Sequence, residues 1–134
     1  MRSTRIVTSF IKNNNKILIL KRSEKVRTMK GLWSGVSGII ENNEKPRDRA
    51  VIEIFEEVGI EKGKISLIKT IEKMKISSPQ YENHEWEVFS FLFKTNETKI
   101  KLNWENSEFK WIELDELKNY ETVPSPEKIL LNLL

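Results

Sequence analysis

Three glutamates of this chain are spaced so that they would lie on one side of a helix and could bind a metal ion. Glu53 precedes Glu56 by three positions and Glu57 by four, and on an α-helix such spacings place Cβ atoms about 5–6 Å apart. With Arg49 they fall within about 100° of arc on a helical wheel. Three carboxylates this close repel one another unless a cation neutralises them. Mg²⁺ prefers oxygen ligands, so the spacing indicates metal-assisted chemistry.

The helix that would carry these glutamates is predicted over residues 46–58. Its apolar residues recur with a period of 3.6, at Ala50, Val51, Ile54, Phe55 and Val58. Pro46 suits the first helical turn, and Gly59 suits the position just past the last one.

Strands are predicted before and after this helix. We expect strands at 5–11, 16–21, 64–76, 84–93 and 108–113, a hairpin turn at 13–15, loops at 22–32 and 77–83, and short helices near 114–120 and 125–133. This order indicates an α/β (α+β) fold with a mixed sheet. The 134 residues contain no linker-like segment and no fixed repeat, so residues 1–134 are expected to form one domain.

The composition excludes several classes of protein. Without cysteine the chain has no disulfide scaffold, thiolate metal site or cysteine nucleophile. The net charge of +3 comes from charges mixed along the chain, so a nucleic-acid binder is not the first interpretation. No apolar run reaches the roughly 18 residues of a membrane span, and the first residues do not resemble a secretory signal. We therefore expect a cytoplasmic protein with no membrane partner.

Residues 38–60 read GIIENNEKPRDRAVIEIFEEVGI. This segment resembles the Nudix box, G-x5-E-x7-R-E-U-x-E-E-x-G-U, in which U is aliphatic. The matching positions are Gly38, Glu44, Glu53, Ile54, Glu56, Glu57, Gly59 and Ile60. Glutamates alone are typical of a solvated helix face, but matches at this many fixed positions favour a functional site.

The resemblance to the MutT-like Nudix family extends from the first hairpin to Trp111 and implies a mixed sheet between helices, with the box forming loop, helix and loop. It also implies that water hydrolyses a nucleoside diphosphate derivative, a small molecule, with Mg²⁺ or Mn²⁺ bound; such ions neutralise phosphate oxygens and activate water. By resemblance the metal ligands are Glu53, Glu56, Glu57 and the Gly38 carbonyl, while Glu44 steadies the loop or acts as a base. Glu105, or Glu108 in its place, would be the carboxylate from outside the box.

Substrate binding is assigned to four residues, Arg22, Lys30, Trp33 and Arg49. Arg22 and Lys30 lie close to the glycine-rich stretch and could meet phosphate charge. Any of the four tryptophans could stack on a base, although core or rim positions are more common. For His84, the only histidine, a structural position is expected. The sequence leaves open whether two copies of the chain pair through their sheets as a homodimer.

One position departs from the family pattern, because Ile52 stands where the box has arginine. In the family that arginine helps to hold the catalytic glutamates, and Arg49, one turn before Glu53, could supply the guanidinium instead. The alternative is a Nudix-fold module that binds a nucleotide or sugar phosphate without cleaving it. A diphosphate isomerase and a single-stranded nucleic-acid binder are further alternatives.

Overall fold

The computed structural model describes residues 2–77 and 83–123. The strands are β1 (Arg2–Asn13), β2 (Lys16–Arg22), β3 (Trp33–Ser34), β4 (Val36–Ile39), β5 (Ile65–Ser77), β6 (His84–Thr95) and β7 (Asn106–Ile112). The helices are α1 (Pro46–Val58) and two short 3-10 helices, η1 (Lys62–Lys64) and η2 (Leu114–Asn119).

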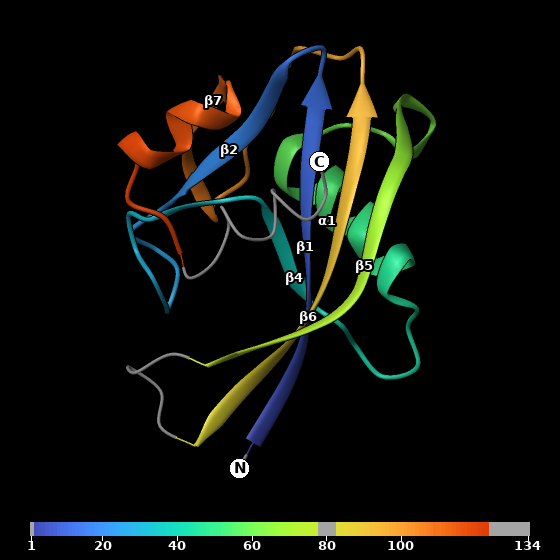
Figure 1. Cartoon of the computed structure of the whole chain (residues 1–134), viewed down its shortest axis with the longest axis vertical. Helices are drawn as coiled ribbons and strands as arrows, with labels where there is room; N and C mark the ends of the chain where they lie inside the picture. The colour runs from blue at the N-terminus through green and yellow to red at the C-terminus, as the bar shows by residue number, and fades with distance from the viewer. Residues whose placement is uncertain (1, 78–82, 124–134) are drawn as a thin grey trace.

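Strand β1 lies inside a seven-stranded mixed sheet whose main path is β3-β2-β1-β6-β5 (Figure 1). β1 and β6 run parallel, beginning with Arg2 beside His84, and the other pairs are antiparallel. On its other edge β1 pairs with β4 over residues 6–9 and then with β2 at residues 12 and 13. This edge of β1 is therefore shared between two neighbours, and β4 brings the glycine-rich stretch toward α1.

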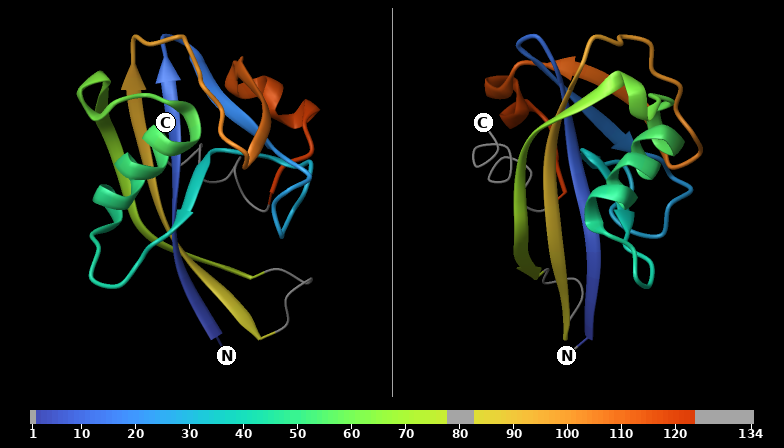
Figure 2. Two further views of the ribbon diagram at one scale, coloured as in Figure 1. Left: turned by 180° about the vertical axis from the view of Figure 1, so that it is seen from behind. Right: turned by 90° about the vertical axis from the view of Figure 1, so that its right-hand side faces the viewer.

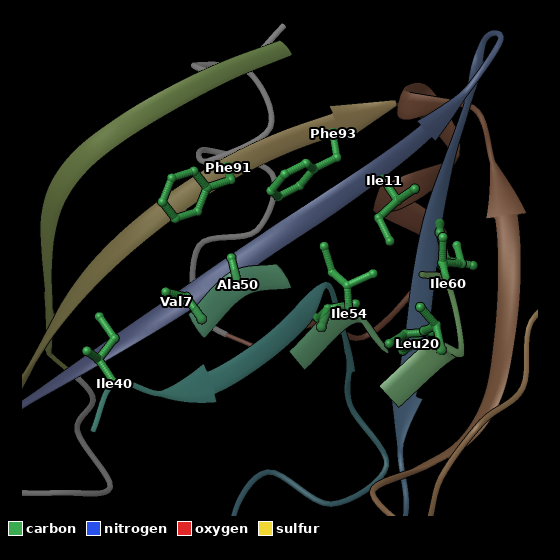
Figure 3. Packing of buried hydrophobic residues seen from close by; sticks show 12 residues of the cluster. Val7, Ile11, Leu20, Ile40, Ala50, Ile54, Ile60, Phe91 and Phe93 are labelled. Atoms are coloured by element: carbon green, nitrogen blue, oxygen red, sulfur yellow. The ribbon is translucent and has the colours of Figure 1, made fainter. Parts of the chain in front are cut away.

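Helix α1 covers one face of the sheet (Figure 2). Ala50, Ile54 and Val58 are buried there, and Figure 3 shows Ala50 and Ile54 near side chains of β1 and β6. Gly59 ends the helix in the left-handed conformation, at φ 77°, and its N–H donates to the Phe55 carbonyl. The predicted helix over 46–58 is confirmed at both ends.

Alternate residues of β1 belong to two different apolar clusters. Val7 and Ile11 pack in the cluster that includes α1, whereas Ile6 and Phe10 pack in the cluster that includes Leu117 of η2. Successive side chains of a strand point to opposite faces, so even-numbered residues of β1 lie on the face away from α1.

The expected α+β fold with a mixed sheet is confirmed, with a few local differences. The hairpin turn is present, with Asn14 at φ 54°. β7 begins at Asn106, two residues earlier than expected, and the segment 114–119 is a 3-10 helix. The predicted helix at 125–133 and most of the predicted loop at 77–83 lie outside the described residues. Among the described residues, no helix has the length and apolar character needed to cross a membrane.

Candidate functional site

Three carboxylates converge where α1 meets the segment before β7. One oxygen from each of Glu53, Glu57 and Glu105 lies within 4.8 Å of the other two. Glu53 is 8% exposed and Glu57 is 3% exposed, because both lie on the side of α1 that packs toward the protein interior. Glu56 is exposed, outside this group but on the wall of the adjoining cleft. We call Glu53, Glu57 and Glu105 the acidic cluster.

Gly38 of β4 lies directly beside this cluster. A Cβ atom at position 38 would come within 2.6 Å of Glu53 Oε2 and still closer to the carboxyl carbon. Only glycine allows the backbone of β4 to approach the carboxylate this closely.

Arg49 joins Glu44 to Glu53. Its Nε and Nη2 donate to Glu44 Oε1 and Oε2 at 2.9 and 2.6 Å, and its Nη1 donates to Glu53 Oε2 at 2.9 Å. The N–H of Glu41 also donates to Glu44 Oε1, at 2.7 Å. The Arg49 guanidinium lowers the pKa of Glu44. Arg49 itself has its pKa raised by these carboxylates, so the pair is fully ionised at neutral pH.

Glu57 is held from β7. The Asn106 side-chain amide donates to Glu57 Oε1 at 3.1 Å, and both side chains are buried. The other oxygen, Glu57 Oε2, is buried and accepts no hydrogen bond from the described residues. A buried carboxylate oxygen without a donor is costly, and a cation bound at the cluster would give it a partner.

The cluster is electrostatically unfavourable without a cation. Burial raises the pKa of Glu57 well above its ordinary value, and the charges of Glu105 and Glu53 raise it further. Burial also raises the pKa of Glu53, although Arg49 opposes that rise. Carboxylates are the ligands that hard divalent ions such as Mg²⁺ prefer. The residues present therefore fit a divalent metal ion.

The segment that carries Glu105 is fixed by hydrogen bonds to its neighbours. Ser23 donates from its hydroxyl to the Trp104 carbonyl at 2.7 Å and from its N–H to the Glu105 carbonyl at 2.9 Å. Within the segment, the Asn103 side-chain amide donates to Glu105 Oε1 at 3.2 Å, while the Glu105 N–H donates to Asn103 Oδ1 at 3.1 Å. These contacts set the position of the third carboxylate.

A cleft of about 680 Å³ runs from the acidic cluster along the even-numbered face of β1. Near the cluster it is lined by Gly38, Glu41, Arg49, Glu53, Glu56, Trp104 and Glu105. Further along β1 and β6 it is lined by Thr4, Ile6, His84, Trp86 and Val88, which we call the aromatic end. There the rings of His84 and Trp86 lie 4.5 Å apart, and His84 Nε2 is 2.7 Å from the Thr4 hydroxyl.

The remaining predicted site residues fall in different places. Arg22 lines the cleft, and its Nε donates to the Thr28 carbonyl at 3.1 Å. Lys30 is exposed and does not line the cleft. Trp33 is a core residue, 8% exposed, whose ring packs edge-on against Tyr120. The structure therefore brings Arg22 to the cleft but not Lys30 or Trp33.

Sequence reasoning named Trp86 only as one of four tryptophans that could stack on a base and His84 as a structural residue, and it missed Thr4 and Asn106. Thr4 pairs with Trp86 across β1 and β6, and period-2 alternation in the two strands could have placed even-numbered residues on one face. No local signal showed that the two strands are adjacent. The only sequence signal for Asn106 was its position directly after Glu105. Glu108, the substitute for Glu105, instead pairs with Lys21 at 3.4 Å.

Comparison with known proteins agrees with this geometry. The sequence model of the NUDIX domain matches residues 2–133. Among solved structures, a MutT protein from Methanosarcina mazei Go1 is similar with a TM-score of 0.76 at 23% identity, covering 98% of this chain and 92% of that one. An Ap4A hydrolase from C. elegans has a TM-score of 0.77 at 18% identity, covering 96% and 93%. The NUDIX domain of Shewanella oneidensis NrtR, solved with ADP ribose, has a TM-score of 0.75 at 13% identity, covering 98% and 86%.

Proposed function

The chain belongs to the Nudix family, and from this premise we propose that it hydrolyses the pyrophosphate linkage of a nucleoside diphosphate derivative with a divalent metal ion. The observation that carries the proposal is the buried acidic cluster at one end of a large cleft. Glu57 Oε2 is buried there without a donor among the described residues. A site with this charge and burial is unfavourable alone and becomes favourable when it holds a cation.

In this proposal most of the acidic residues serve the cation, and one steadies the neighbouring loop. Glu53, Glu57 and Glu105 hold the cation. Glu56 contributes a further carboxylate from the exposed side of α1, and the Gly38 carbonyl is a possible backbone ligand. The bound cation would supply neutralisation of the phosphate oxygens and a lowered pKa for the attacking water. Glu44 is paired with Arg49 and has a lowered pKa, so it steadies the loop and is a weak base.

The rest of the substrate would lie along the cleft. Thr8 Oγ1 lies 3.5 Å from Ser37 Oγ, and Ser37 precedes Gly38 beside the acidic cluster. Thr4, at the aromatic end, is four residues from Thr8, about 13 Å at the usual rise of a strand. In this proposal the phosphates lie at the acidic cluster, where the cation would neutralise their oxygens. Arg22 lines the same cleft and adds positive charge. A flat base would lie at the aromatic end, against Trp86.

A hydrolysis screen tests this function. Nucleoside diphosphate sugars, dinucleoside polyphosphates and nucleoside triphosphates would be incubated with the protein and Mg²⁺ or Mn²⁺, and the products identified by phosphorus NMR. We expect metal-dependent cleavage of at least one diphosphate linkage and no cleavage in excess EDTA. Glu108→Gln serves as a control variant that should cleave as the wild type does, because Glu108 pairs with Lys21 and is not part of the acidic cluster. Metal-independent cleavage would contradict the proposal.

Ile52 supports a second candidate function, a binding module that does not cleave its ligand. The arginine of the family pattern is absent, and Ile52 is 39% exposed on α1. For such a module, calorimetry would detect binding of a nucleotide or a sugar phosphate, whereas the screen would detect no turnover. Binding together with turnover would exclude it.

A further inference from the structure

We propose that Arg49 and Asn106 are the positioning residues of this site, and that together they fix the carboxylates of Glu53 and Glu57 for metal binding. The inference rests on the proposed function for its consequence in catalysis, but its test measures metal binding directly. Neither residue occupies position 52, where the family pattern has its arginine. Arg49 lies one turn earlier on α1, and Asn106 lies outside the box at the start of β7.

Arg49 connects the loop before α1 to one metal ligand. Two of its nitrogens bind both oxygens of Glu44, and a third binds Glu53 Oε2. A guanidinium bound in this forked manner has a fixed orientation. Glu44 is in turn held by the N–H of Glu41. Because three guanidinium nitrogens already donate to carboxylates, the geometry assigns Arg49 to positioning and not to substrate binding.

Asn106 acts on the second proposed ligand, Glu57, from the start of β7. Its amide donates to Glu57 Oε1 and leaves Oε2 without a donor among the described residues. Since Asn106 follows Glu105 in the chain, the start of β7 supplies both a carboxylate and the donor that orients another. The hydrogen bonds from the Ser23 hydroxyl to the Trp104 carbonyl and from the Ser23 N–H to the Glu105 carbonyl hold this segment against the loop after β2.

The two donors hold different ligands, so each should affect metal affinity separately. Partners that orient metal ligands typically change affinity or activity by about 10–100-fold when removed. We therefore expect Arg49→Met and Asn106→Leu, which preserve approximate side-chain volume, each to weaken Mn²⁺ binding by about tenfold or more. Controls on adjacent exposed positions, Arg47→Met and Ser107→Ala, should bind Mn²⁺ as the wild type does.

The experiment titrates the full chain with Mn²⁺ and follows free Mn²⁺ by electron paramagnetic resonance. Far-UV circular dichroism and the Tm without metal show whether each variant is folded, and the rise in Tm on adding Mn²⁺ gives a second measure of binding. Wild-type Mn²⁺ affinity in a folded Arg49→Met or Asn106→Leu variant would overturn the role of that residue.

A double-mutant cycle separates positioning from a general structural role. If Asn106 acts through Glu57, then Asn106→Leu should weaken Mn²⁺ binding no further once Glu57→Leu, which removes the oxygen that accepts from Asn106, is present. A full additional loss in that background would overturn the positioning role. Binding of Mn²⁺ by the wild type without hydrolysis of any diphosphate would contradict the proposed function while supporting the two positioning roles. Absence of Mn²⁺ binding by the wild type would overturn both positioning roles.

Discussion

The α-carbon of Gly38 lies against the carboxyl group of Glu53, close enough that a side chain at position 38 would overlap that carboxyl group. The contact ties the geometry of the acidic cluster to the path of β4, because β4 pairs with β1 on one side and meets α1 on the other. A side chain that we propose as a metal ligand and a strand of the sheet are therefore in direct contact at this site.

Gly38→Ala should damage the site more than the fold. The added methyl group must displace Glu53, and a misplacement of about 1 Å can lower a rate on the order of 10²-fold. Overpacking at such a position typically destabilises a protein by about 1–3 kcal/mol. Initial rates and urea unfolding measure both effects. Gly63→Ala is the matched control, since a Cβ there meets no atom within 4 Å; an active Gly38→Ala protein would contradict this geometry.

Glu57→Gln should abolish metal-dependent turnover while raising the Tm of the metal-free protein. The substitution removes a charge with almost no change in volume, and it relieves repulsion within a buried cluster. The Asn106 amide can still donate to the remaining oxygen. Turnover at saturating Mg²⁺ and calorimetric Tm in EDTA are the measurements. Turnover equal to that of wild type would place the reaction elsewhere.

The stability of the metal-free protein should rise as pH falls from neutral toward 4.5. The folded-state pKa values of Glu57 and Glu53 are raised above their ordinary value of 4.5. A raised carboxyl pKa contributes stability that is present below the unfolded pKa and is lost as pH rises through the folded pKa. Below 4.5 the trend should reverse, because Glu44 has a lowered pKa and its pairing with Arg49 is lost on protonation.

Thermal unfolding in EDTA across this pH range checks both directions. In Glu57→Gln the rise between neutral pH and 4.5 should be smaller, because one of the two raised carboxyl groups is gone. A wild-type Tm that falls steadily over that interval, in parallel with the variant, would show that the cluster does not titrate as described.

Trp86→Leu should weaken substrate binding without slowing the chemical step. Stacking of a base on an aromatic side chain is worth about 1–3 kcal/mol, so KM should rise roughly tenfold or more while kcat stays within about twofold. Trp104→Leu is an informative comparison, because Trp104 is 60% exposed near the acidic cluster and should affect KM less. A change confined to kcat would place the base away from the aromatic end.

Ile52→Arg should change turnover little or lower it. The guanidinium of Arg49 already holds Glu44 and Glu53, so a second guanidinium would compete for the same carboxylates. Initial rates on any accepted substrate measure the effect. A large gain in rate would indicate that Arg49 does not replace the missing arginine and that the natural chain is a poor catalyst.

Local features of the fold were predictable from the sequence, and distant pairings were not. Pro46 and Gly59 mark the ends of α1, and the asparagines before Lys16 mark the hairpin, because capping and turn preferences act over a few residues. The pairing of β1 with β6 depends on contacts across about eighty residues and leaves no local pattern.

In the candidate site, too, local spacing was predictable from the sequence and contacts between distant segments were not. The spacing on α1 predicted that Glu53, Glu56 and Glu57 would lie together, and the resemblance to the family pointed to Glu105 as a carboxylate from outside the motif. Helical spacing could not show that Glu57 would be buried against Asn106 while Glu56 stayed exposed, because that depends on where β7 begins. Trp33 was assigned to the substrate because its ring could stack on a base, yet its position in β3 carries it into the core beside Tyr120.

The parallel pairing of β1 with β6 also has a consequence for how the chain folds. The first strand completes its pairing only after residues 84–95 have left the ribosome, so its apolar residues must wait for most of the chain to be synthesised. Until then β1 can pair with β2 and β4, which follow it closely. Closing so long a loop is entropically costly before the contacts form. Refolding should therefore be slower than for helical domains of this size, and the aromatic end of the cleft, built from both strands, should appear in the last step.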